Sequence, residues 1–201
     1  MIDDFAKEYL HDSLRWVREG LLSKLDGLSE YDVRRPLTAT GTNLLGLVKH
    51  LSVTEARYFS EVFDRPSPWP LPRWDSDEAW SGADMWAAES ETRVEILERY
   101  ELAGQFTDAT VEALSIDAAG HVPWWPRPNV KLFNVMVHLV AETNRHAGHA
   151  DILREQLDGV VGTGTDGQVL HGEDAGYWAD RRTAIEQAAQ VAAEARRGLV
   201  D

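Results

Sequence analysis

One stretch of the chain, residues 129–156, most restricts the folds that this sequence can adopt. Its spacing predicts a helix, and the first turns of that helix are apolar on almost every side. The apolar residues in these turns are Val130, Leu132, Phe133, Val135, Met136, Val137, Leu139 and Val140. A helix that is apolar all round is buried among partners rather than lying on a surface. The rest of the chain must therefore supply helices that cover it.

Apolar residues that recur at spacings of three and four predict these partner helices. Further helices are expected over residues 3–28, 43–63, 84–114 and, rich in alanine, 174–198. Four prolines, at positions 66, 68, 70 and 72, predict an irregular crossover that runs roughly to residue 80. No segment shows the alternation typical of a strand. The pattern predicts an all-α fold, a four-helix bundle with a long crossover and an extra C-terminal helix.

The remaining segments are predicted to connect these helices. Residues 121–128 contain three prolines and cannot be helical, and the glycine-rich residues 158–172 are expected to form a loop. We expect residues 1–160 to form the bundle. Residues 161–201 are expected to form a loop and a helix that packs on the bundle, where it could also serve as the contact of a homodimer.

The charge of the chain excludes several classes of partner. It has 34 acidic residues against 20 basic ones, a net charge of −14, whereas nucleic acids and anionic membranes attract clustered Lys and Arg. The apolar runs fall far short of the ~18 residues that a membrane span needs. The N-terminus is acidic where a signal peptide would be basic. We expect a cytoplasmic protein that binds neither nucleic acid nor membrane.

The chain contains no cysteine. This excludes disulfides, a thiol nucleophile within the protein and a cysteine-based zinc site. Any metal must be held by His, Asp and Glu. Any thiol chemistry must use a thiol that comes from outside the protein.

A polar stripe runs along the predicted helix 129–156. His138, Glu142, His146 and His149 lie at about 0°, 40°, 80° and 20° around its axis, so they share one face. Such a stripe in a core-forming helix is unfavourable unless its polar groups are satisfied. A metal ion would satisfy imidazole and carboxylate ligands together. Pairing of histidine with glutamate and with backbone groups is the alternative.

The stripe alone does not decide which of its residues would bind one ion. His138 and His149 are separated by about 16 Å along the axis, so the pair could be His138 with Glu142, Glu142 with His146, or His146 with His149. A third ligand must come from another helix. His50 lies among apolar residues of the predicted helix 43–63 and is the candidate, although a satisfied core histidine is the alternative. We interpret His138 as a core histidine.

Two regions of the sequence resemble a known superfamily. They are TNLLGLVKHL at 42–51 with EARYF at 55–59, and HLVAETNRHAGHADILRE at 138–155. They resemble the DinB/YfiT-like metal-binding four-helix bundles, and more narrowly the branch of mycothiol-dependent S-transferases, over residues 1 to about 160. The resemblance implies that His50, Glu142 and His146 hold the metal. Most of the superfamily has histidine at the position of Glu142, and glutamate there resembles the mycothiol-dependent maleylpyruvate isomerases.

The resemblance also implies an activity. Two imidazoles and a carboxylate leave coordination positions open, as in catalytic zinc sites. We expect a divalent metal, zinc before nickel, iron or manganese, and mycothiol as the thiol that attacks an electrophilic small molecule. The alternatives are a thiol-dependent isomerase of the maleylpyruvate type, a non-heme iron oxygenase with the same ligand types, and a non-catalytic metal-binding stress-response bundle.

Four residues near the expected ligands are candidates for further roles. His149 could act as a base or orient a ligand, or it could cap or pack. Trp124 and Trp125 could form an apolar lip over a bound substrate, or anchor their proline-rich loop to the core. Arg57 could contact an anionic group, or pair with Glu61 on the next turn.

Overall fold

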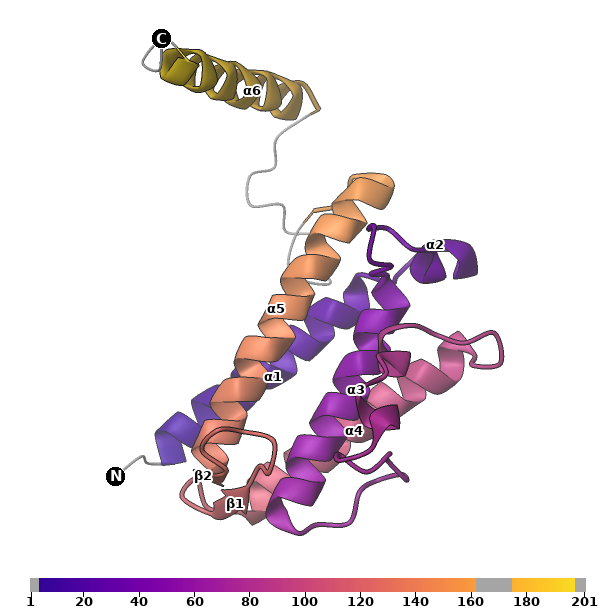
Figure 1. Ribbon diagram of the computed structural model, residues 1–201, viewed down its shortest axis with the longest axis vertical. Coiled ribbons are helices and arrows are strands. Elements are labelled where there is room, and N and C mark those ends of the chain that lie inside the picture. The colour runs from indigo at the N-terminus through magenta and orange to yellow at the C-terminus, as the bar shows by residue number, and fades with distance from the viewer. Residues whose placement is uncertain (1–3, 162–174, 198–201) are drawn as a thin grey trace.

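The computed structural model describes residues 4–161 and 175–197, and its main body is a bundle of four long helices (Figure 1). These helices are α1 (Asp4–Ser23), α3 (Leu44–Ser60), α4 (Arg93–Ala113) and α5 (Leu132–Asp158). Helix α5 packs on α1 and α3, α3 packs on α4, and α1 meets α4. The predicted all-α fold is therefore confirmed. The expectation that α5 is buried on every side is wrong, because α1 and α3 cover only part of it and Val137 is 42% exposed. No helix of the described residues is long and apolar enough to cross a membrane.

Shorter elements connect the long helices. They are α2 (Glu30–Arg34), the 3-10 turns η1 (Glu61–Phe63), η2 (Asp77–Trp80) and η3 (Ala83–Met85), and the strands β1 (Ala119–His121) and β2 (Asn129–Lys131). Helix α3 begins where the sequence predicts, because the side chain of Asn43 accepts a hydrogen bond from the amide of Gly46. Helix α3, its N-cap Asn43 and the turn η1 together span residues 43–63, the range that we expected for this helix.

Helix α4 begins nine residues later than predicted. The side chain of Thr92 accepts a hydrogen bond from the amide of Glu95, and the Glu95 carboxylate accepts one from the Thr92 amide. This capping box fixes the helix start. The residues predicted as the first turns of the helix instead form η3 and a short irregular stretch, so the crossover extends to residue 92, and η3 packs against α3.

Lys49 of α3 binds three groups of this crossover and so holds it on the bundle. Its ammonium group donates to the carbonyls of Ala83 (2.8 Å) and Trp86 (3.0 Å) and pairs with the Glu91 carboxylate (2.7 Å). The crossover is therefore held against the middle of α3.

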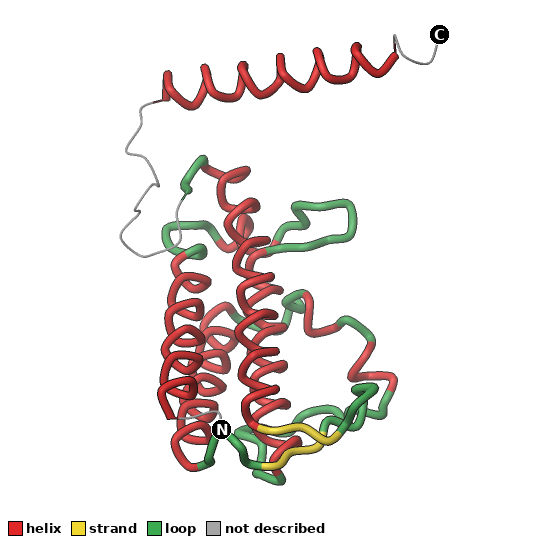
Figure 2. The backbone as a smooth tube through the Cα atoms, turned by 90° about the vertical axis from the view of Figure 1, so that its left-hand side faces the viewer, coloured by secondary structure: helices red, strands yellow, loops and turns green. Residues whose placement is uncertain are grey.

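The two strands were not predicted from the sequence. Ala119 pairs with Lys131 and His121 with Asn129 in an antiparallel hairpin at one end of the bundle (Figure 2). Strands of three residues are too short to show alternation, and residues 129–131 were wrongly assigned to the following helix. The non-helical conformation predicted for residues 121–128 is confirmed, because they form the turn of this hairpin.

The apolar residues of α1 do not all face the core. Leu14, Val17 and Leu21 are buried, but Phe5 and Tyr9 are 74% and 68% exposed. At about 100° per residue, Phe5 and Tyr9 lie about 180° and 140° from Leu14, on the opposite side of the helix. Their rings stack on each other, with centroids 6.5 Å apart.

A buried charged network, which the sequence did not predict, ties α1 to α3 and α4. The Arg18 guanidinium contacts the Glu55 carboxylate at 2.8–3.0 Å and the Asp108 carboxylate at 2.8 Å. Thr107 donates its hydroxyl to Glu55 (3.1 Å), and His11 contacts Asp108 at 2.9 Å. Because Glu55 is fully buried, its charge depends on these partners.

This network predicts a loss of stability in acid. Burial opposes ionisation of Asp108, but the hydrogen bonds with His11 and Arg18 outweigh it and hold the pKa of Asp108 well below its ordinary value. A carboxyl with a lowered folded pKa stabilises the protein above its unfolded pKa of about 3.9, and that contribution is lost as the pH falls toward the folded value. Urea unfolding at about pH 5 and about pH 3 should show a larger loss of unfolding free energy for wild type than for Asp108→Asn. Equal losses would show that Asp108 does not carry the effect.

Helix α6 (Ala175–Arg197) forms where the alanine-rich helix was predicted. Residues 176–193 are exposed, except for the half-buried Tyr177. Packing of this helix on the bundle, or on a second copy, stays a prediction. Helix α5 ends at Gly159, which has a positive φ of 79° suited to glycine, and most of the loop expected over 158–172 lies outside the described residues.

Candidate metal centre

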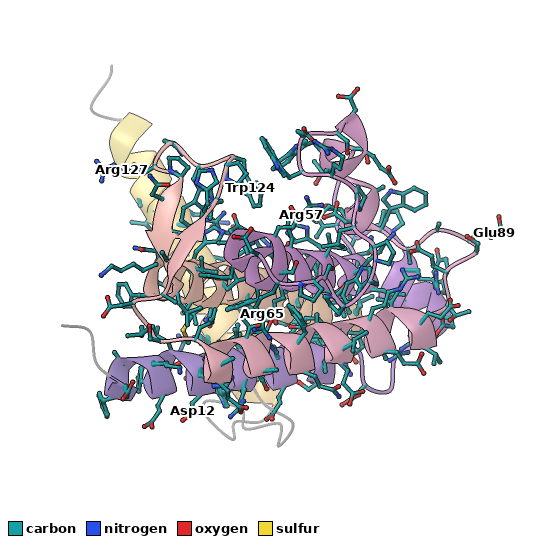
Figure 3. All side chains as sticks on the ribbon, turned by 90° about the horizontal axis from the view of Figure 1, so that it is seen from below. Asp12, Arg57, Arg65, Glu89, Trp124 and Arg127 are labelled. Carbon is teal, nitrogen blue, oxygen red and sulfur yellow. The ribbon has the colours of Figure 1, made fainter. Side chains whose placement is uncertain are left out.

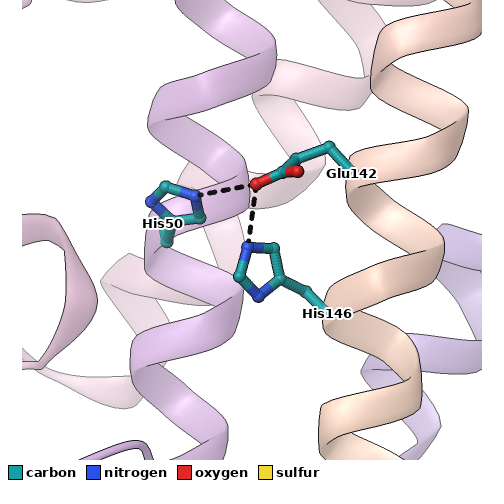
Figure 4. A group of neighbouring side chains, drawn as sticks. All are labelled: His50, Glu142 and His146. Atoms are coloured by element: carbon teal, nitrogen blue, oxygen red, sulfur yellow. Dashed lines mark hydrogen bonds and ion pairs between the residues drawn. The ribbon is translucent and has the colours of Figure 1, made fainter. Parts of the chain in front are cut away.

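Helices α3 and α5 bring His50, Glu142 and His146 together. Figure 4 shows His50 on α3 facing Glu142 and His146, which lie one turn apart on α5. His146 Nε2 lies 3.1 Å from Glu142 Oε1, and His50 Nε2 lies 3.9 Å from the same oxygen. One ligand atom from each residue lies within 4.8 Å of the other two. Of the three pairs that the helix stripe allowed, the structure thus joins Glu142 and His146 to His50.

This spacing fits a single metal ion. A tetrahedral ion with bonds of about 2.0–2.1 Å separates its ligand atoms by about 3.3 Å, and the two distances to Glu142 bracket that value. Burial, followed by the nearby His50, lowers the pKa of His146. The neutral imidazole is the form that binds a metal. These three residues could therefore hold a divalent ion with small side-chain adjustments.

Asp84, in η3 of the crossover, orients His50. Its carboxylate oxygen Oδ2 accepts a hydrogen bond of 2.7 Å from His50 Nδ1. Burial opposes ionisation of Asp84, but the bond with His50 outweighs it, so the pKa of Asp84 lies below its ordinary value. With Nδ1 as the donor, Nε2 keeps its lone pair on the side of Glu142. The role of Asp84 could not be predicted from the sequence, because Asp84 lies 34 residues from His50 in a segment without periodicity.

We expect Asp84→Ala to weaken zinc binding by about 10–100-fold, because such outer partners fix the orientation and basicity of a ligating imidazole. Asp84→Asn keeps an acceptor oxygen and should weaken binding less. Competition with a chromophoric chelator would measure both affinities. Equal affinities of Asp84→Ala and wild type would show that Asp84 does not support His50.

The other two histidines of the stripe lie outside the ligand set. His149 is exposed, and its Nδ1 lies 3.4 Å from Nδ1 of His146. His138 is half-buried, and its ring packs 4.9 Å from both the Tyr58 and the Trp125 rings. Burial lowers the pKa of His138. These surroundings agree with its interpretation as a histidine of the core.

A cavity of about 350 Å³ opens beside the three residues. Its lining includes His50 and Glu142, together with Val53, Thr54, Arg57, Tyr58, Ala79, Trp80, Gly82, Asp84, Met85, Trp124 and His138. The lining residues come from helices α3 and α5, from the hairpin turn and from the crossover. The cavity is large enough for a small molecule, and two of the candidate ligands, His50 and Glu142, line it.

Arg57 and Trp124, two of the candidates, lie near each other at this cavity (Figure 3). Arg57 is almost fully buried. It donates to the carbonyl of Pro72 (2.8 Å), and its Nη1 lies 3.6 Å from the Glu61 carboxylate, so the expected pairing with Glu61 is present. Trp125 is not among the residues that line the cavity, and its ring packs against Tyr58 with the centroids 5.8 Å apart.

Comparison with known proteins identifies the family of the chain. The family model for Mycothiol-S-transferase matches residues 9–159, which contain the bundle and all three candidate ligands. No curated protein matches the chain. Because the match covers most of the sequence, the chain belongs to the mycothiol S-transferase family, within the DinB-like superfamily.

Proposed function

We propose that this protein is a metal-dependent S-transferase that joins mycothiol to an electrophilic small molecule. The observation that carries the proposal is the convergence of His50, Glu142 and His146 at the edge of a cavity. Membership in the mycothiol S-transferase family supports mycothiol as the thiol. The lack of cysteine fits, because the reacting thiol then comes only from the co-substrate.

The donor set favours zinc. Two imidazoles and one carboxylate are a common arrangement of catalytic zinc, with positions left for a further ligand. When bound, zinc would lower the pKa of a coordinated thiol, so that thiolate is available near neutral pH. Nickel, iron and manganese are alternatives for the same ligands.

The residues of the chain then have separate tasks. His50, held by Asp84, and the neutral His146 supply imidazole nitrogens, and Glu142 supplies a charge that offsets that of the ion. The cavity beside them would hold the electrophile. The thiolate sulfur attacks the electrophilic carbon, the S–C bond forms, and a leaving group such as halide departs with its electron pair.

The other candidate residues keep supporting tasks in this proposal. Arg57 and Trp124 border the cavity and are proposed to contact the substrates. Trp125 contributes through Tyr58 rather than directly. His149, beside His146, is proposed to orient that imidazole or to accept a proton. A cytoplasmic location, where small thiols stay reduced, suits the proposed co-substrate.

A thiol screen tests the proposal. Zinc-loaded protein is incubated with monochlorobimane and, in separate reactions, mycothiol, cysteine or glutathione, and the conjugate is measured by fluorescence. We expect the fastest conjugation with mycothiol, loss of activity on chelation and recovery on adding zinc. Absence of conjugation with every thiol would contradict the proposal. A reaction that needs oxygen and a reductant, but no thiol, would favour an iron oxygenase.

An isomerase is the second candidate, because glutamate at position 142 resembles the mycothiol-dependent maleylpyruvate isomerases. Such an enzyme would use the same residues but return the thiol unchanged. Mass spectrometry separates the two: a transferase consumes one mycothiol per product, whereas an isomerase consumes none.

A further inference from the structure

The hydroxyl group of Tyr58, on α3, is held by two indole rings of the hairpin turn. It accepts a hydrogen bond of 3.1 Å from Trp124 Nε1 and one of 2.9 Å from Trp125 Nε1. The Tyr58 ring packs against both indoles, with centroids 5.4 and 5.8 Å away, and against His138 at 4.9 Å. The position of the hydroxyl is therefore fixed from several sides.

With both indole bonds in place, the Tyr58 hydroxyl can still donate its own proton in a hydrogen bond. A hydroxyl oxygen has two acceptor positions and one proton to donate. Both indoles occupy acceptor positions, so the proton must point in a third direction. Within residues 4–161 and 175–197, the hydroxyl makes no further hydrogen bond. A donor at a largely buried position costs free energy when it is unpaired, which favours an acceptor that comes from a ligand.

The cavity is where such an acceptor can bind. Tyr58 lines it together with His50 and Glu142, so the Tyr58 side chain and two candidate metal ligands border the same cavity. Burial raises the pKa of Tyr58, and the charge of Glu142 raises it further, against the indole bonds that lower it. The phenol thus remains protonated at neutral pH and can act as a donor there.

We propose that the Tyr58 hydroxyl donates a hydrogen bond to an oxygen atom of the electrophile, and that the preferred electrophiles are α,β-unsaturated carbonyl compounds. This inference rests on the proposed S-transferase function. The thiolate forms an S–C bond at the β-carbon, the C=C electron pair shifts, and negative charge develops on the carbonyl oxygen. Tyr58 stabilises that charge, and the enolate then takes a proton from water at the α-carbon. No oxidant or reductant is needed.

The arrangement gives Tyr58 the character of a preorganised donor. A donor already fixed where charge develops stabilises a transition state without reorganising, and removal of one such donor costs about 10²–10³-fold in rate. An electrophile that releases halide places its charge on the leaving group and gains nothing from Tyr58. The residue should therefore set the choice between electrophile classes.

Tyr58→Phe tests this choice with two probes of similar size, phenyl vinyl ketone and benzyl bromide, each with mycothiol and zinc-loaded protein. We expect kcat/KM to fall about 100-fold for the ketone and far less for the bromide. Zinc affinity should be unchanged. Equal losses for both probes, or no loss for the ketone, would overturn the proposal.

Trp125→Phe tests the fixation of the hydroxyl separately, because it keeps the Tyr58 hydroxyl but removes one of the two indole hydrogen bonds that hold it. It should lower the ratio of the ketone rate to the bromide rate, but by a smaller factor than Tyr58→Phe does, because the donor remains and only its fixation is weakened. A change in the ratio equal to that of Tyr58→Phe would overturn the proposal, since packing rather than the hydroxyl would then set the preference.

Wild-type protein provides a test that does not depend on folding of the variants. Relative to the same thiol in solution, the enzyme should accelerate the ketone reaction about 100-fold more than the bromide reaction. Equal accelerations would overturn the role of Tyr58 but leave the S-transferase function intact. If the enzyme accelerates neither of these two reactions nor any other thiol conjugation, the proposed function itself is rejected.

Discussion

Replacing His50 with alanine should reduce zinc affinity about 100-fold. A zinc-binding free energy of about 10–16 kcal/mol, shared by four ligands, gives about 3 kcal/mol for each protein ligand. Helix α3 supplies only His50 to the candidate centre, so α5 alone would have to hold the ion in the variant. Metal analysis after dialysis and chelator competition would measure the loss.

His138→Ala is the matched control, because His138 lies on α5 one turn from Glu142 but faces Tyr58 and Trp125. It should keep the zinc affinity of wild type. Equal zinc content in wild type and His50→Ala would reject the ligand assignment. Glu142→Ala should also lose affinity; if it does not, His146 with His149 becomes the pair to test.

Replacing Arg18 with methionine should lower the free energy of unfolding by about 3–5 kcal/mol, because it leaves a buried carboxylate without its counterion. Glu55 is fully buried, and Arg18 approaches both of its oxygens. Urea unfolding monitored by circular dichroism would give the difference. Combining Arg18→Met with Glu55→Leu should recover much of the loss, since no unpaired charge then remains in the core.

Arg15→Met provides the control on the same helix. The Arg15 side chain is 43% exposed and pairs with Asp108 and with two other exposed carboxylates. Its removal should cost about 1 kcal/mol or less. If Arg18→Met and Arg15→Met cost the same, the buried network does not stabilise the bundle as described.

The helices could be predicted from the sequence because apolar periodicity is a local signal. The apolar first turns of α5 required partner helices, and the spacing of three and four located them. The start of α4 was missed although the sequence carried its signal, threonine at 92 followed by glutamate at 95. The three-residue strands carried no such signal, because they are shorter than any detectable alternation.

The candidate site, too, could be predicted from the sequence only in part. The stripe of His138, Glu142 and His146 on one helix face could be read from the sequence, but not which pair would meet His50. The contacts of Asp84 with His50 and of Trp124 with Tyr58 join segments 34 and 66 residues apart. Such contacts depend on how the crossover and the hairpin turn fold over α3, which periodicity does not encode.

X-ray absorption at the zinc edge, with and without mycothiol, tests the central claim most directly. The claim is that this site presents a thiol to the electrophile. The chain has no cysteine, so a sulfur atom bound to zinc would identify the added thiol. We expect only nitrogen and oxygen neighbours at about 2.0–2.2 Å without mycothiol, and an additional sulfur neighbour at about 2.3 Å with it. An unchanged spectrum at saturating mycothiol would contradict the account.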